Sequence, residues 1–184
     1  TYIILFVIFG AFLEKSGAQS FFIDFPLAAV GHKVGGPGKV SVIASGLFGS
    51  ISGSAIANTV STGAFTIPMM KKAGFKPHVA GGIEPAASIG GMFMPPIMGA
   101  GGFIMAELTG VPYSRIMLIA IFPAVMYFYS VYMMVHWEAK MYDIVGEPSK
   151  EKAMTILKRE WIYTLPLVVI TIFMLNGYSP GYSA

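Results

Sequence analysis

Cysteine is absent from this sequence of 184 residues, and charged residues are scarce. The absence of cysteine excludes disulfide bonds, thiolate nucleophiles and metals bound through cysteine. Charged residues make up 11% of the sequence, whereas soluble domains contain about 25%. Hydrophobic residues make up 55%, and the mean hydropathy is +0.69. We therefore expect an integral membrane protein rather than a soluble domain.

The sequence also lacks the patterns of several common functional sites. His32, His78 and His136 have no second ligand at helical spacing, so we expect no metal site built on histidine. Ser52 and Ser54 have no histidine or lysine at helical spacing, which argues against an intramembrane enzyme. No phosphate-binding loop of the form G-x-x-x-x-G-K-S/T occurs. The net charge of +3 comes largely from lysines in short loops, which is typical of cytoplasmic loops in bacterial membrane proteins rather than of nucleic-acid binding.

Long uncharged stretches are what the sequence does contain, at 1–13, 40–70, 85–106, 116–135 and 161–184. A membrane-spanning helix needs roughly 20 apolar residues. The first stretch is shorter than that and has no initiator methionine, so we interpret it as the end of a helix that begins earlier. No basic region precedes it, which argues against a signal peptide.

The 40–70 stretch has lysines at both of its ends, and lysines mark the cytoplasmic face. A straight helix of this length would measure about 46 Å, whereas the hydrocarbon core is about 30 Å thick. A fold at Ser52-Gly53-Ser54 resolves both conflicts by making a re-entrant hairpin whose tip stops inside the membrane. The flanking lysines are Lys33, Lys39, Lys71, Lys72 and Lys76.

The other segments complete an all-α integral membrane protein. Phenylalanines fall on one helical face of 20–33, which favours a helix lying along the interface. Charges and glycines predict a broken helix over 77–112, a spanning helix over about 113–136 and a last one from Trp161. The mixed charges of the connector 138–160 indicate a solvated amphipathic helix on the cytoplasmic side.

Polar residues follow the bend of the hairpin at helical spacing. Ser54, Asn58, Ser61 and Thr62 share one face of the second arm. A helix that starts inside the membrane offers free N–H groups to an anionic group, while hydroxyls and carbonyls freed by a bend suit a hard cation such as sodium. The alternative is close helix packing through small residues, including the G-x-x-x-G pattern of Gly49 and Gly53.

A second interruption lies at Gly90-Gly91 and Pro95-Pro96, and it offers further carbonyl oxygens. The alternative interpretation is a simple proline kink. Glu84, near the start of this broken helix, is a functional candidate if it is buried in the membrane, and a snorkelling interfacial residue if it is not. A channel could also use a re-entrant hairpin, but it would need a filter of repeated carbonyls or a charged ring, and no such ring is visible.

These same residues resemble the large membrane subunit of TRAP (tripartite ATP-independent periplasmic) transporters, especially the fused type that works with TAXI-type binding proteins. The resemblance covers essentially the whole chain. Its most specific part is the SGS hairpin followed by IPMMKKAGF. The similar stretches are LFVIFGAFLEKSG (5–17), GGPGKVSVIASGLFGSISGSAIANTVSTGAFTIPMMKKAGF (35–75), EPAASIGGMFMPPIMGAGGFIMAE (84–107), and the closing PLVVI and GYSP.

The resemblance implies an elevator-type secondary transporter of the bacterial inner membrane, with several membrane passes and no cofactor. A sodium gradient would drive uptake of small organic anions, chiefly carboxylates, delivered by a periplasmic TAXI-type binding protein. A small membrane subunit, separate or fused, would be a further partner. The substrate itself and the number of coupling ions cannot be inferred from the residues.

The family builds its site from two inverted repeats, and this sequence contains one hairpin and one broken helix. The expected units are 1–35 (the end of a scaffold helix and the interfacial arm), 36–76 (the hairpin), 77–112 (the broken helix) and 113–184 (two spanning helices with a charged connector). Sodium is expected at Ser52, Ser54, Asn58 and Gly91. The residues expected around sodium and substrate together are Ser52, Gly53, Ser54, Asn58, Ser61, Thr62, Gly90, Gly91, Pro95 and Pro96.

Overall fold

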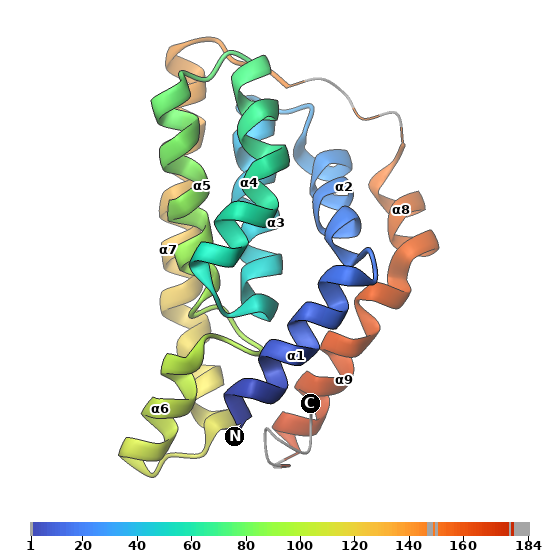
Figure 1. Ribbon diagram of the computed structural model, residues 1–184. Helices are drawn as coiled ribbons and strands as arrows, with labels where there is room; N and C mark the ends of the chain where they lie inside the picture. The colour runs from blue at the N-terminus through green and yellow to red at the C-terminus, as the bar shows by residue number, and fades with distance from the viewer. Residues whose placement is uncertain (1, 147–148, 150, 177, 179–184) are drawn as a thin grey trace.

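The computed structural model describes residues 2–146, 149, 151–176 and 178, and its regular elements are all helices (Figure 1). This confirms the expected all-α class for the described residues. Besides the helices, these residues contain one isolated β-bridge, between Val34 and Val145. A short 3₁₀ turn, Trp161–Tyr163, joins the last two helices. In chain order the helices are α1 (Tyr2–Lys15), α2 (Ala18–Val30), α3 (Gly36–Ser52), α4 (Ala55–Lys72), α5 (Pro77–Gly91), α6 (Ala100–Thr109), α7 (Tyr113–Met141), α8 (Ala153–Glu160) and α9 (Leu165–Leu175).

Helices α3, α4 and α5 pack against one another and form the centre of the molecule. α3 is buried along nearly its whole length because it also contacts α1, α2 and α7. Figure 1 shows α5 and α7 running side by side, with α1, α2, α8 and α9 on the opposite side of the hairpin. The central helices carry small and hydroxylated residues, which lets their backbones approach closely.

The helical hairpin bends where the sequence predicts. α3 ends at Ser52, Gly53 has φ 62°, and α4 begins at Ala55 with Ser54 as its N-cap. Glycine adopts this left-handed conformation at little cost, so Gly53 and Ser54 alone connect the two helices. The Ser54 hydroxyl accepts a hydrogen bond from the Ala57 amide at 3.3 Å. The position of this bend inside a membrane stays a prediction.

The second interruption is a loop between α5, which ends at Gly91, and α6, which begins at Ala100. Tyr113, at the start of α7, fixes this loop from outside, because its hydroxyl donates to the Ile97 carbonyl oxygen and lies 3.3 Å from that of Pro96. Its ring stacks on Phe103 of α6 with 4.4 Å between centroids. The break is therefore a held loop of several residues rather than a kink in a continuous helix.

The expectation of a solvated amphipathic helix over the 138–160 connector was right only for the last part of the connector. Its first part continues α7 as far as Met141, and only Ala153–Glu160 forms a separate helix, α8. The described residues of the 142–152 stretch lie outside the named helices, and Asp143 there has φ 52°. Within the described residues, α7 alone is long and apolar enough for a full membrane crossing, with a mean hydropathy of 1.9.

Candidate ion and substrate site

The two interruptions of the central helices touch each other. A side chain at Gly53 would place its Cβ 2.8 Å from the Met98 carbonyl oxygen, and one at Gly99 would place its Cβ 2.9 Å from the Gly53 carbonyl oxygen. The hairpin tip and the α5–α6 loop thus meet backbone to backbone. This juxtaposition gathers peptide groups that lie outside regular helices at one place in the fold.

A second close approach lies one turn deeper, between the two arms that carry these breaks. A Cβ at Gly91 would lie 2.5 Å from the Gly49 Cα and 3.1 Å from the Ser45 carbonyl oxygen. Real Cβ atoms do not approach backbone this closely, so only glycine fits at Gly91. The G-x-x-x-G pattern predicted for packing does serve packing, since Gly49 holds α3 against the end of α5.

Ser52 carries the one buried side-chain polar atom without a hydrogen-bond partner among the described residues. It is the last residue of α3, directly before the turn. An unpaired buried hydroxyl costs about 1–3 kcal/mol relative to a paired one. This unpaired hydroxyl lies in the chain directly before Gly53, whose backbone meets the α5–α6 loop.

Asn58 and Thr62 face inward from α4 and are fully buried. The Asn58 side-chain amide donates to the Ser45 carbonyl oxygen at 2.8 Å, which ties the two arms of the hairpin together. The Thr62 hydroxyl lies 2.7 Å from the Asn58 carbonyl oxygen. Asn58 therefore positions the arms, and its side-chain nitrogen is already engaged within the hairpin.

Glu84 is the centre of a polar cluster, of which the sequence analysis identified only Glu84 and Thr62 as candidates. Its carboxylate is fully buried between α3, α4 and α5, so the snorkelling alternative is wrong. Hydroxyls of three helices donate to it, and no basic side chain in the described ranges forms an ion pair with it. The donors are Ser41 at 2.5 Å, Ser45 at 2.6 Å, Thr66 at 2.6 Å, Thr62 at hydrogen-bond distance and, more distantly, Ser88 at 3.4 Å.

Two hydroxyl pairs and one carboxyl–hydroxyl pair of this cluster follow one spacing in the sequence. Ser41 and Ser45, Thr62 and Thr66, and Glu84 and Ser88 are each four residues apart and so share one helix face. The i, i+4 repetition of hydroxyls in apolar helices could have revealed Ser41, Ser45, Thr66 and Ser88. That they converge on one carboxylate depends on how three helices pack.

The remaining predicted residues are distributed around this centre. Gly90 is buried at the end of α5, and Pro95 and Pro96 are half-buried in the loop that meets the hairpin tip. Ser61 is half-buried, next to Thr62 but outside the Glu84 cluster. The structure thus brings the predicted tip and break residues together and places Thr62 mainly with Glu84.

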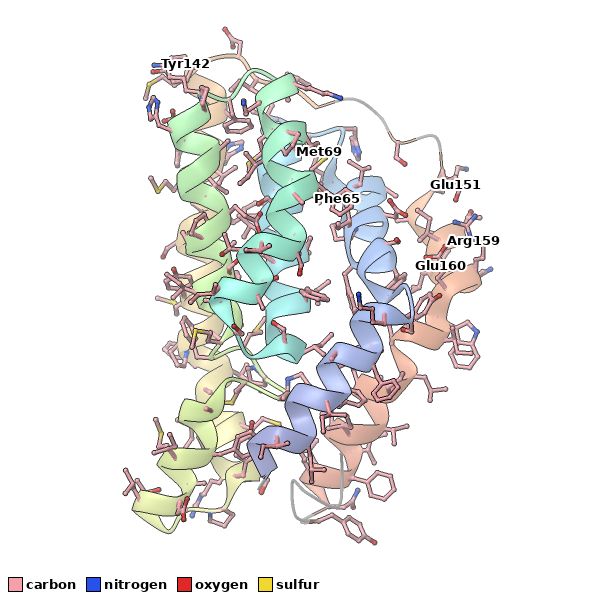
Figure 2. All side chains as sticks on the ribbon, in the orientation of Figure 1. Phe65, Met69, Tyr142, Glu151, Arg159 and Glu160 are labelled. Atoms are coloured by element: carbon pink, nitrogen blue, oxygen red, sulfur yellow. The ribbon has the colours of Figure 1, made fainter. Side chains whose placement is uncertain are left out.

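An open hollow of about 820 Å³ lies along the outer side of the hairpin, between α2 and the second half of α4. The lysine distribution predicts that this half of α4 is the cytoplasmic one. Phe65 and Met69 line it from α4, and Figure 2 shows both on the side of α4 that faces α2. Lys72 also lines this hollow.

At α8, Figure 2 shows Glu151, Arg159 and Glu160 grouped on the surface, where Arg159 pairs with both carboxylates.

Discontinuous helices that meet around polar groups are typical of one class of protein, the secondary transporters. Comparison with known proteins gives the family: the model of the tripartite ATP-independent periplasmic transporter, DctM component, matches residues 1–184. The chain therefore belongs to this family. Its relatives are named as transport permeases, which supports a transporter over an enzyme and does not favour a channel.

Several curated relatives are similar over almost the whole chain. A TRAP transporter large permease protein of Haemophilus influenzae is 30% identical over 95% of this chain and 41% of its own length. The 2,3-diketo-L-gulonate TRAP transporter large permease protein YiaN of Escherichia coli is 28% identical over 95% of this chain and 41% of its own length. The sialic acid TRAP transporter permease protein SiaT of Haemophilus influenzae is 26% identical over 97% of this chain and 29% of its own length.

Proposed function

We propose that this chain works, within a large permease, in sodium-coupled import of small organic anions across the bacterial inner membrane. The chain spans about two fifths of the length of the first relatives. The observation that carries the proposal is the contact between the hairpin tip and the α5–α6 loop, with the unpaired Ser52 hydroxyl beside it. Irregular backbone at membrane depth is tolerated where it lines a polar site.

Sodium is the ion that this geometry suits. Hard cations take oxygen ligands from hydroxyls and backbone carbonyls, and both kinds are concentrated at the two breaks. We assign the ion to the region of Ser52, Ser54 and Gly91, with Asn58 bracing the arms through its bond to the Ser45 carbonyl oxygen. Half of the site would come from the second repeat that the family resemblance implies.

A carboxylate is the substrate group that we propose for the tip. The first turn of α4 presents backbone N–H groups and the positive end of the helix dipole toward the bend. The names of two relatives specify 2,3-diketo-L-gulonate and sialic acid, both of which carry a carboxylate. A periplasmic binding protein, of TAXI type by the resemblance, and a small membrane subunit would complete the transporter, and α2 would be the arm of an elevator motion.

Reconstitution of the full-length permease tests this proposal. Proteoliposomes containing the permease and its small subunit would receive purified binding protein loaded with a labelled carboxylate. We expect uptake when sodium is high outside, and uptake near background when potassium replaces sodium. Equal uptake in the two salts would exclude sodium coupling, and no uptake in either salt, with the purified proteins folded, would exclude the transport proposal.

A further inference from the structure

The Glu84 carboxylate is buried, and no side chain among the described residues forms an ion pair with it. Its facing groups on α3 are Ser41 and Ser45, on α4 they are Thr62 and Thr66, and on α5 the nearest is Ser88. A charge taken out of water costs several kcal/mol unless a partner ion or a proton compensates it. Hydroxyl donors reduce this cost but leave the net charge in place.

Three titratable groups on helices packed near Glu84 make their contacts elsewhere. On α7, the Tyr127 hydroxyl donates to the Ala86 carbonyl oxygen at 2.9 Å. His136 on α7 lies 3.0 Å from the Lys39 ammonium of α3 through its Nδ1. Neither contact involves Glu84. Within the described residues, no charged side chain therefore forms an ion pair with the Glu84 carboxyl.

The hydroxyl cluster can satisfy Glu84 both with and without a proton. Each hydroxyl has one proton to donate and can also accept. The Thr62 hydroxyl has a second acceptor at 2.7 Å, the Asn58 carbonyl oxygen, and the Thr66 hydroxyl has one at 3.1 Å, the Thr62 carbonyl oxygen. When the carboxyl is protonated, its O–H can donate to a serine oxygen while the threonine hydroxyls turn to these carbonyls.

The geometry points to Glu84 as a proton-binding site, distinct from the sodium site at the breaks, through which uptake is coupled to pH. This inference rests on the proposed transport function. Binding forms one O–H bond on the carboxylate, and release breaks the same bond, so the proton is the only species exchanged. A proton needs no added room, whereas a metal ion would have to displace hydroxyls that already lie 2.5–2.6 Å from the carboxylate oxygens.

The site has a physical connection to the hairpin. Thr62 contacts both the Glu84 carboxylate and the Asn58 carbonyl oxygen, and Asn58 holds the two arms together through the Ser45 carbonyl oxygen. A change of the proton on Glu84 turns the Thr62 hydroxyl from one acceptor to the other. The expected consequence is that proton binding and the hairpin conformation influence each other.

Proton flux during uptake is the first test. Proteoliposomes of the full-length permease would contain a pH-sensitive dye and receive the loaded binding protein in the presence of sodium. Wild type should acidify the lumen in proportion to substrate uptake. Glu84→Gln, which keeps the shape and removes the titration, should lose this acidification, and Glu84→Asp should retain it. Glu107→Gln, on the exposed surface of α6, should behave as wild type. Equal acidification by Glu84→Gln and wild type would overturn the inference. Substrate uptake by wild type without acidification of the lumen would overturn it as well.

An infrared measurement separates this inference from the transport proposal. Difference spectra of the purified permease between acidic and alkaline buffer should contain the carbonyl stretch of a protonated buried carboxyl. Glu84→Gln should lose this band and Glu107→Gln should keep it. Thr66→Val, which retains the carboxyl but removes one hydrogen-bond partner of it, should shift the frequency of the band, and it serves if Glu84→Gln does not fold.

The outcomes of the two tests can be told apart. If the band depends on Glu84 but the protein shows no uptake, the proton site is supported and the transport proposal is contradicted. If wild type shows uptake but no such band, the proton site is contradicted and the transport proposal is supported.

Discussion

Thr62 connects the Glu84 cluster to the hairpin, because its one hydroxyl proton can go to either the Glu84 carboxylate or the Asn58 carbonyl oxygen. It is fully buried, and no water can replace its hydroxyl without rearrangement of three helices. Its loss would leave the carboxylate short of one donor. The stability of the hairpin therefore depends on a hydroxyl in the middle of an apolar helix.

Thr62→Val should destabilise the full-length permease by about 1–3 kcal/mol, because a buried charged group loses a hydrogen-bond donor. Thr59→Val, the same substitution at a half-buried position three residues earlier, should change stability by less than about 0.5 kcal/mol. Thermal or denaturant unfolding in detergent measures both. In the Glu84→Gln background the cost of Thr62→Val should fall, and purely additive effects would contradict the proposed pairing.

At the scale of elements, the bend and the break were readable from the sequence, while the cluster between them was not. Glycine and proline disrupt helices locally, so Gly53 and the Gly91–Pro96 stretch revealed where helices end. The partners of Glu84 lie 18–43 residues away on α3 and α4, and only the packing of these helices brings them together. The connector after α7 was predicted only in part, because mixed charges indicate a solvated surface and do not fix where a helix begins or ends.

Gly91→Ala should separate the hairpin from α5, since its Cβ would lie 2.5 Å from the Gly49 Cα and backbone cannot move aside as a side chain can. We expect a loss of folded permease or a marked fall in its melting temperature. Gly82→Ala is the matched control in the same helix, because nothing lies within 4 Å of its added Cβ. The control should leave stability unchanged or raise it by up to about 1 kcal/mol through helix propensity. Equal effects of the two substitutions would contradict the close approach.

At the scale of the whole molecule, the two ends of the structure differ in their number of basic residues. Figure 1 shows the α4–α5 turn and the end of α7 at one end, and the turn from α6 to α7 at the other. The first end carries Lys33, Lys71, Lys72 and Lys76, and the second carries Arg115. The positive-inside rule assigns the lysine-rich end to the cytoplasm.

Single cysteines at Lys33 and Lys72, both exposed, should therefore react with a membrane-impermeant reagent only from the cytoplasmic side, and a cysteine at Arg115 only from the periplasmic side. The sequence has no native cysteine to interfere. Whole cells compared with inside-out vesicles give the measurement. Reaction of the cysteines at positions 33 and 72 from opposite faces would mean that α3 and α4 do not form a re-entrant hairpin.

The most direct test of the sodium site is the sodium dependence of uptake by Ser52→Ala in the full-length permease. The Ser52 hydroxyl is buried without a partner within the described residues, so its removal should not lower expression or melting temperature. If the hydroxyl is an ion ligand, its loss costs about 1–3 kcal/mol, which raises half-saturating sodium roughly 5- to 150-fold. Ser130→Ala, at an exposed position of α7, should leave it unchanged. Unaltered half-saturation in Ser52→Ala, at matched expression, would contradict the placement of the ion at the hairpin tip.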